Sequence, residues 1–133
     1  MSHDGGPVSR SAPLRRTVLG LLFASNAINV GFLAFDERMW APELLTGSAL
    51  LAGVFAYVVA VPLVWRDRKE GYQLMLVVVP LASIVVVGDN FSVFGSTPNE
   101  ATYWLNWAFF AAQVPLAGAS GLWLRAHGGP GAP

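Results

Sequence analysis

The stretch Ala101–Leu124, ATYWLNWAFFAAQVPLAGASGLWL, decides the fold, because it runs for 24 residues without a charged side chain. A helix crosses the hydrocarbon layer of a bilayer with about 17–25 mostly apolar residues. Three further uncharged runs have a similar length: Thr17–Phe35, Leu44–Trp65 and Gly71–Gly88. The chain is 54% hydrophobic and 12% charged, and a soluble domain carries about twice that charged fraction.

The sequence therefore predicts an all-α integral membrane protein with four transmembrane helices in an antiparallel bundle. Short links between the runs force neighbouring helices to be antiparallel. The membrane domain is predicted to cover residues 13–126. The tails 1–12 and 127–133 are rich in Gly, Pro and Ser and are predicted to be disordered. The predicted spans cover about residues 15–35, 42–65, 71–88 and 98–124.

A cleaved signal peptide is the alternative interpretation of the first span. Arg15 and Arg16 would be its basic start, and Leu19–Ala24 its apolar centre. Ser25–Ala27 would then supply the small residues of a cleavage site. The apolar run continues through Leu33, whereas the apolar centre of a signal peptide has about 7–15 residues. The length therefore favours a membrane anchor.

Basic residues predict the orientation of the four spans. Seven of the eight Lys and Arg residues fall on one side of a four-span chain, together with three acidic residues. Arg38 lies on the other side with the remaining five acidic residues. Basic residues in short loops stay in the cytoplasm, so both termini are predicted to be cytoplasmic, in the plasma (inner) membrane. The seven residues are Arg10, Arg15, Arg16, Arg66, Arg68, Lys69 and Arg125.

Asp89 lies where the third span leaves the apolar layer. It follows the middle of that span by about 10–14 Å at ~1.5 Å per residue, and the hydrocarbon half-thickness is about 15 Å. Asp89 is therefore predicted to be a carboxylate at the outer rim of the membrane. The simpler interpretation is a hydrated interfacial residue, and the alternative is a functional carboxylate that serves a polar cavity.

Asn26 and Asn29 place two amides near the middle of the first span. They are three residues apart and share one helical face. An amide in lipid is costly unless it finds partners. We therefore expect either a hydrogen-bonded helix clamp, worth about 0.6 kcal/mol per bond, or the polar lining of a path for a substrate or ion. Tyr57, Asn106 and Gln113 are the candidate partners in either case.

Small residues recur at helical spacing in the first two spans. Such a stripe lets helix backbones approach closely, so these positions are predicted to pack helices together. The stripes are Gly20, Ala24, Ala27 and Gly31 in the first span, and Ala49, Gly53, Ala56 and Ala60 in the second.

Missing residue types limit the chemistry. The chain has no cysteine, and its two histidines, His3 and His127, belong to the predicted tails. Thiol chemistry and histidine-ligated haem within the membrane are therefore excluded. Because these ligand types are missing from the spans, we expect no metal and no cofactor. We also expect no nucleic-acid partner, because the basic residues form no large patch.

Three functions remain open. The leading one is an accessory subunit or homo-oligomer that acts through helix packing, without evident catalysis. The second is a small transporter or channel with Asn26, Asn29, Gln113 and Pro80 near its path. The third is a membrane enzyme acting on a lipid or quinone-like substrate, with Asp89 as its acid or base. The expected partners are the lipid bilayer, and a second copy or other membrane subunits.

Overall fold

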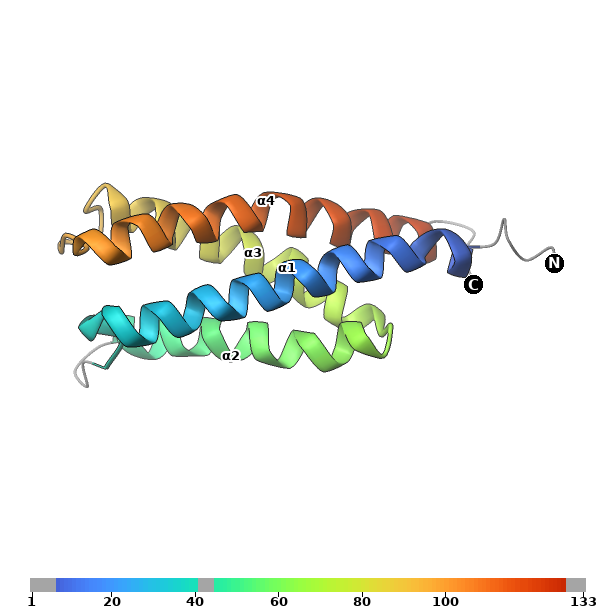
Figure 1. Cartoon of the computed structure of the whole chain (residues 1–133), viewed down its shortest axis with the longest axis horizontal. Coiled ribbons are helices and arrows are strands. Elements are labelled where there is room, and N and C mark those ends of the chain that lie inside the picture. Colours follow the sequence, from blue (N-terminus) through green and yellow to red (C-terminus); the bar gives the residue numbers. More distant parts are fainter. Residues whose placement is uncertain (1–6, 41–44, 129–133) are drawn as a thin grey trace.

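The computed structural model describes residues 7–40 and 45–128, and places side chains for residues 12–40 and 50–127. All regular elements in the described residues are helices (Figure 1). A short 3-10 helix, η2 (Glu37–Trp40), follows the first α-helix. The α-helices are α1 (Pro7–Phe35), α2 (Leu45–Trp65), α3 (Lys69–Asn90) and α4 (Glu100–Gly128).

Three of these helices contain segments long and apolar enough to cross a membrane: Ala12–Phe35, Lys69–Asn90 and Glu100–His127. The fourth, α2, contributes the shorter apolar segment Leu50–Trp65. The all-helical part of the prediction is therefore confirmed. The predicted second span begins at residue 42, and residues 41–44 lie outside the described part of the chain.

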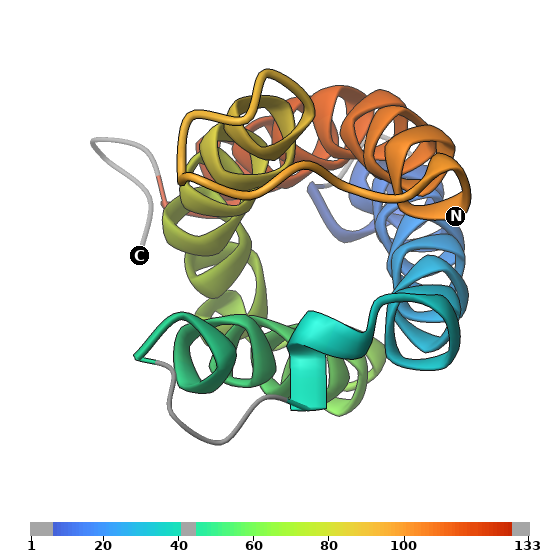
Figure 2. The same cartoon turned by 90° about the vertical axis from the view of Figure 1, so that its left-hand side faces the viewer.

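The four α-helices form an antiparallel ring. α1 packs against α2 and α4, and α3 packs against the same two helices. In the described residues neither diagonal pair, α1 with α3 or α2 with α4, approaches closely along the backbone. The start of α1, the end of α4 and the turn between α2 and α3 lie toward one end of the bundle (Figure 1). η2 and the loop 91–99 cross the opposite end (Figure 2).

The first and last helices, α1 and α4, extend into the segments predicted to be tails. α1 already begins at Pro7, because proline suits the first helical position, where its fixed φ fits and its missing N–H is not needed. α4 includes His127, whose ring stacks on Trp123 at a centroid distance of 3.9 Å. Residues 1–6 and 129–133 lie outside the described residues, and the prediction for them is untested.

The solid core fills the half of the bundle near the α2–α3 turn. α2 and α3 approach closely there, because Gly71 has no side chain. A Cβ added at Gly71 would lie only 2.8 Å from Leu63 Cβ and 2.9 Å from Val64 Cγ2. The rings of Tyr72 and Trp123 stack nearby at 3.9 Å. The fully buried apolar side chains in this half include Val18, Leu22, Val64, Tyr72, Met75 and Leu116.

In the other half of the bundle, Asn99 connects the end of α1 with the start of α4. Its Oδ1 accepts a hydrogen bond from the backbone N–H of Thr102 at 2.8 Å, which caps the start of α4. Its Nδ2 donates to the carbonyl of Phe35, the last residue of α1, at 2.8 Å. Asn99 thereby fixes the start of α4 against the end of α1, and η2 follows directly from that point.

Candidate functional site

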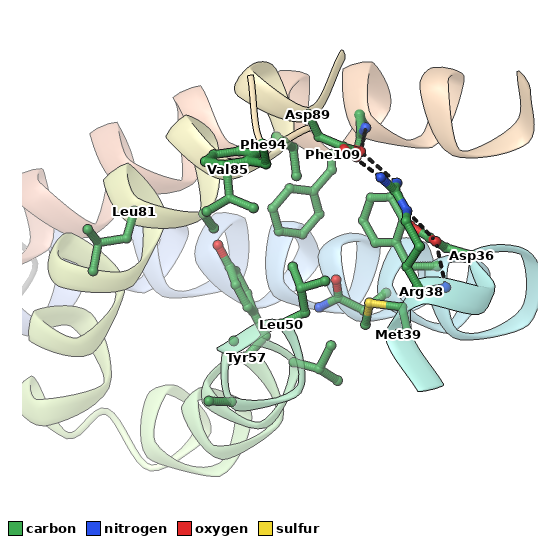
Figure 3. Close-up of a pocket in the computed structure, with 18 of the residues that line it drawn as sticks. Asp36, Arg38, Met39, Leu50, Tyr57, Leu81, Val85, Asp89, Phe94 and Phe109 are labelled. Carbon is green, nitrogen blue, oxygen red and sulfur yellow. Dashed lines mark hydrogen bonds and ion pairs between the residues drawn. The ribbon is translucent and has the colours of Figure 1, made fainter. Parts of the chain in front are cut away.

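A cavity of about 760 Å³ lies in the half of the bundle that η2 and the loop 91–99 cross. All four α-helices contribute to its lining, which is mainly apolar. Figure 3 shows the side chains of Leu81, Val85 and Phe109 around this space, with the charged residues at one end. α2 contributes Leu50, Ala52, Gly53, Val54, Ala56 and Tyr57.

Arg38 forms the polar end of the cavity together with two aspartates. Its guanidinium donates to both carboxylate oxygens of Asp89, with Nη1–Oδ1 at 2.8 Å and Nη2–Oδ2 at 2.9 Å. It also donates to both oxygens of Asp36, with Nε–Oδ1 and Nη2–Oδ2 at 2.9 Å. Asp36 directly follows α1 and Asp89 lies in the last turn of α3, so Arg38 joins two helix ends (Figure 3).

The guanidinium of Arg38 has no spare donor. Nη1 makes its second hydrogen bond to Ser96 Oγ at 2.7 Å, so all five N–H groups have acceptors. These contacts, first those with Asp36 and then those with Asp89, raise the pKa of Arg38 above its usual value and keep it protonated. One cation faces two carboxylates, so with both ionised the cluster has a net charge of about −1.

Asn106 extends the cluster to α4. Its Nδ2 donates to Asp89 Oδ2 at 2.9 Å and to Asn90 Oδ1 at 2.7 Å. Asn106 is buried, with 3% of its surface exposed. The sequence grouped this residue with Asn26 and Asn29, whereas its side chain serves Asp89 at the end of the bundle.

A second polar network crosses the bundle through Gln113. Tyr57 O–H donates to Gln113 Oε1 at 2.5 Å, and Gln113 Nε2 donates to Ser25 Oγ at 3.0 Å. All three side chains are buried. The network joins α1, α2 and α4, and because Tyr57 also lines the cavity, it borders the cavity on the side of the solid core.

Asn26 and Asn29 have separate roles. Asn26 Nδ2 donates to the carbonyls of Leu22 at 2.9 Å and Tyr57 at 3.1 Å, and thus clamps α1 to α2. Asn29 lines the cavity with 5% of its surface exposed. Its Nδ2 has no hydrogen-bond partner among the described residues.

The residues of the small-residue stripes lie in different surroundings, and their predicted role in helix packing stays a prediction. Gly31 meets α4, because a Cβ there would lie 3.2 Å from the methyl groups of Leu105, and Ala60 is buried. Gly53 and Ala56 line the cavity, and a Cβ at Gly53 would meet no atom within 4 Å. Gly20, Ala24 and Ala27 are exposed, and the side chain of Ala49 lies outside the described part.

Sequence reasoning missed the role of Arg38. It treated this residue only as an orientation signal and Asp89 as a separate rim carboxylate. One signal was present: Arg38 is the one basic residue on a side with five acidic residues. A lone cation among carboxylates of its own side is a candidate ion-pair centre.

In the described segments no group of three or more His, Cys, Asp or Glu side chains is placed to hold a metal ion. The chain matches no protein-family model, no curated protein and no solved structure. Its function is therefore inferred from the cavity and the polar groups around it.

Proposed function

We propose that this protein is an integral membrane protein that binds a small, mostly apolar molecule inside its helix bundle. The cavity of about 760 Å³ supports this function. Ligand pockets are typically about 300–1,000 Å³, mainly apolar, and have a few polar groups that fix orientation. Here the Arg38 cluster and Asn29 are such polar groups within a lining of aliphatic and aromatic side chains.

Placement in a membrane is supported by the outer surface of the bundle. Phe55, Val77 and Ile84 each have more than half of their surface exposed, which suits contact with lipid. We infer that the bundle crosses the plasma (inner) membrane four times with both termini in the cytoplasm. The start of α1, the α2–α3 turn and the end of α4 lie toward one end of the bundle (Figure 1), and these segments contain Arg15, Arg66 and Arg125. Arg15 also donates to the carbonyl of Trp65 at 3.1 Å. This grouping of basic residues supports the proposed orientation.

A photolabelling experiment tests the binding function. The protein is placed in lipid nanodiscs with dodecyl diazirine, an apolar reagent that cross-links to its surroundings under light, and the labelled peptides are mapped. Gly53→Leu narrows the cavity, because Gly53 lines it and open space surrounds this position. Gly118→Leu is the matched control, since Gly118 is exposed on α4 and also has no atom within 4 Å of an added Cβ.

We expect labelling of the buried cavity residues Tyr57 and Val86 in the wild-type protein and in Gly118→Leu, and less in Gly53→Leu. Labelling of the outer residues Val77 and Ile84 serves as the internal reference, because these side chains face away from the bundle. Equal labelling of Tyr57 and Val86 in all three proteins would show that the reagent does not occupy the cavity, and would refute the proposal.

Association with a second copy or another membrane subunit is the second candidate function. Gly20, Ala24 and Ala27 form an exposed small-residue face on α1, and such faces let helices approach closely. The chain has no cysteine, so Ala24→Cys introduces a single thiol. Disulfide-linked dimers of Ala24→Cys on oxidation, absent for Val77→Cys on α3, would support a homo-oligomer. Equal cross-linking of both variants would exclude this face as a specific contact.

A further inference from the structure

We propose that Asn29 anchors a neutral, mostly apolar ligand by donating a hydrogen bond to a carbonyl-type oxygen, as found in ketones, quinones and esters. This inference rests on the proposed function and names the chemical class of the ligand. Asn29 is 95% buried, since 5% of its surface is exposed. It lines the cavity, and its Nδ2 has no hydrogen-bond partner among the described residues.

The neighbouring amide of Asn26 has hydrogen-bond acceptors within the helix bundle. Its Nδ2 bonds two backbone carbonyls, one in α1 and one in α2. Asn29, one helical turn further along, makes no such clamp within the described structure. A buried donor without an acceptor destabilises a protein, so a purely structural role does not explain the amide of Asn29. An acceptor supplied by a ligand does.

The other buried or half-buried side-chain donors of the described lining are already used. Arg38 has acceptors for all five N–H groups. Asn106 Nδ2 makes two hydrogen bonds, and the hydroxyl of Tyr57 donates to Gln113. A ligand acceptor therefore finds its free partner at Asn29.

The charges in the cavity select a neutral ligand. An anion would find no free N–H on Arg38 and would meet two carboxylates. A cation would have to displace Arg38, because Asp36 and Asp89 each bind its guanidinium through both oxygens. The remaining lining is mainly apolar. The fitting molecule thus has an uncharged acceptor and an apolar body.

The position of Asn29 also indicates where the ligand comes from. Asn29 borders a second hollow, of about 400 Å³, between α1 and α2. Phe23, Val30 and Val58 line this hollow and are about half exposed or more. Asn29 therefore lies between the cavity and this second, apolar hollow on the outside of the bundle. We infer that the ligand enters from the bilayer.

Infrared spectroscopy tests this assignment. The full-length protein is placed in nanodiscs of ether-linked phospholipid, which has no carbonyl, and methyl nonyl ketone with an isotope-labelled carbonyl is added. We expect a bound ketone band at lower frequency than in protein-free nanodiscs, because hydrogen bonding weakens the carbonyl bond. Asn29→Leu should abolish this band, and Gly118→Leu should retain it.

Competition against dodecyl diazirine measures the affinity of the same ketone. Asn29→Leu should weaken the competition by about five- to tenfold, the effect of one neutral hydrogen bond. In wild-type protein, undecane should compete less well than the ketone by a similar factor. Asn29→Leu removes an unpaired polar group and keeps the branching and the number of heavy atoms of the side chain, and the cavity has room for its larger methyl groups, so the variant is expected to fold.

A second arm distinguishes the two sources of a carbonyl. Nanodiscs of ester-linked phospholipid with isotope-labelled carbonyls are examined without ketone. A lowered band that depends on Asn29 in this arm identifies a membrane lipid as the occupant. The same band in the ketone arm alone identifies a free ketone-type molecule.

Two results would overturn the inference: a lowered band that persists in Asn29→Leu, or undecane competing as well as the ketone. In both cases the labelling that depends on Gly53 would still stand, and with it the proposed binding function. Loss of all cavity labelling in the wild-type protein would instead remove both proposals.

Discussion

Arg38 and Asp89 are 51 residues apart in the sequence and are joined by two hydrogen bonds of 2.8 and 2.9 Å. This pair connects η2, which follows α1, with the last turn of α3. α1 and α3 are diagonal in the ring and do not pack against each other in the described residues. The ion pair therefore links the ends of α1 and α3 across the cavity, although these two helices, as far as the structure describes them, do not pack against each other.

Asp89→Asn should destabilise the protein. The change leaves Arg38 with one carboxylate partner instead of two, and hydrogen bonds to charged groups contribute about 1.5–3 kcal/mol. We expect a loss toward the lower end of that range, since 27% of the Arg38 side chain is exposed and water screens the pair. Thermal unfolding in nanodiscs measures the effect. Glu37→Gln is the control because Glu37 is exposed, and equal losses in both variants would show that the pair contributes nothing.

Gly71→Ala should destabilise the turn between α2 and α3. The added methyl group would lie 2.8 Å from Leu63 Cβ and 3.0 Å from the backbone N of Val64, and overpacking typically costs about 1–3 kcal/mol. Gly118→Ala should stabilise α4 by about 0.5–1 kcal/mol, because alanine favours a helix and the position is open. Unfolding measurements give the stability of both variants. If both were more stable than the wild-type protein, or both less stable, the described packing would be contradicted.

Asn29→Leu should stabilise the protein when no ligand is added. It removes a buried amide that has no partner in the described structure, and such a group costs about 1–3 kcal/mol. Asn26→Leu should do the opposite, because it removes two hydrogen bonds. Unfolding is compared in nanodiscs of ether-linked lipid. A loss of stability in Asn29→Leu as large as that in Asn26→Leu would mean that Asn29 is a structural clamp.

Reporter fusions test the proposed orientation. Fusions after Arg125 and within Arg66–Glu70 should report the cytoplasm, because these segments have most of the basic residues. Fusions near Met39 and Ser96 should report the outside. A fusion after Arg125 that reports the outside would contradict a four-span topology with both termini in the cytoplasm.

Helix content could be predicted from the sequence because it depends on local composition. An uncharged run such as Ala101–Leu124 has the length of a membrane-crossing helix whatever its neighbours are, and α4 occupies it. Helix ends were harder to place. The stack of His127 on Trp123 continues α4 past the expected boundary, and it depends on side chains that a composition count ignores.

The candidate site could be predicted only in part, because its contacts are non-local. The pattern identified Asn26, Asn29 and Asp89 as notable polar residues, but it could not show that Arg38 binds Asp89 or that Asn106 joins them. Gly53 illustrates a second limit. A small residue permits either a close helix contact or an open cavity, and the spacing is the same in both cases.

Analysis of molecules that purify with the protein tests the central claim most directly. Wild-type protein, Gly53→Leu and Gly118→Leu are purified from the same membranes, and their organic extracts are compared by mass spectrometry at equal protein amounts. We predict a neutral apolar molecule with a carbonyl oxygen, recovered with the wild-type protein and with Gly118→Leu but depleted from Gly53→Leu. Equal recovery of every apolar molecule from all three proteins would contradict a ligand-binding cavity.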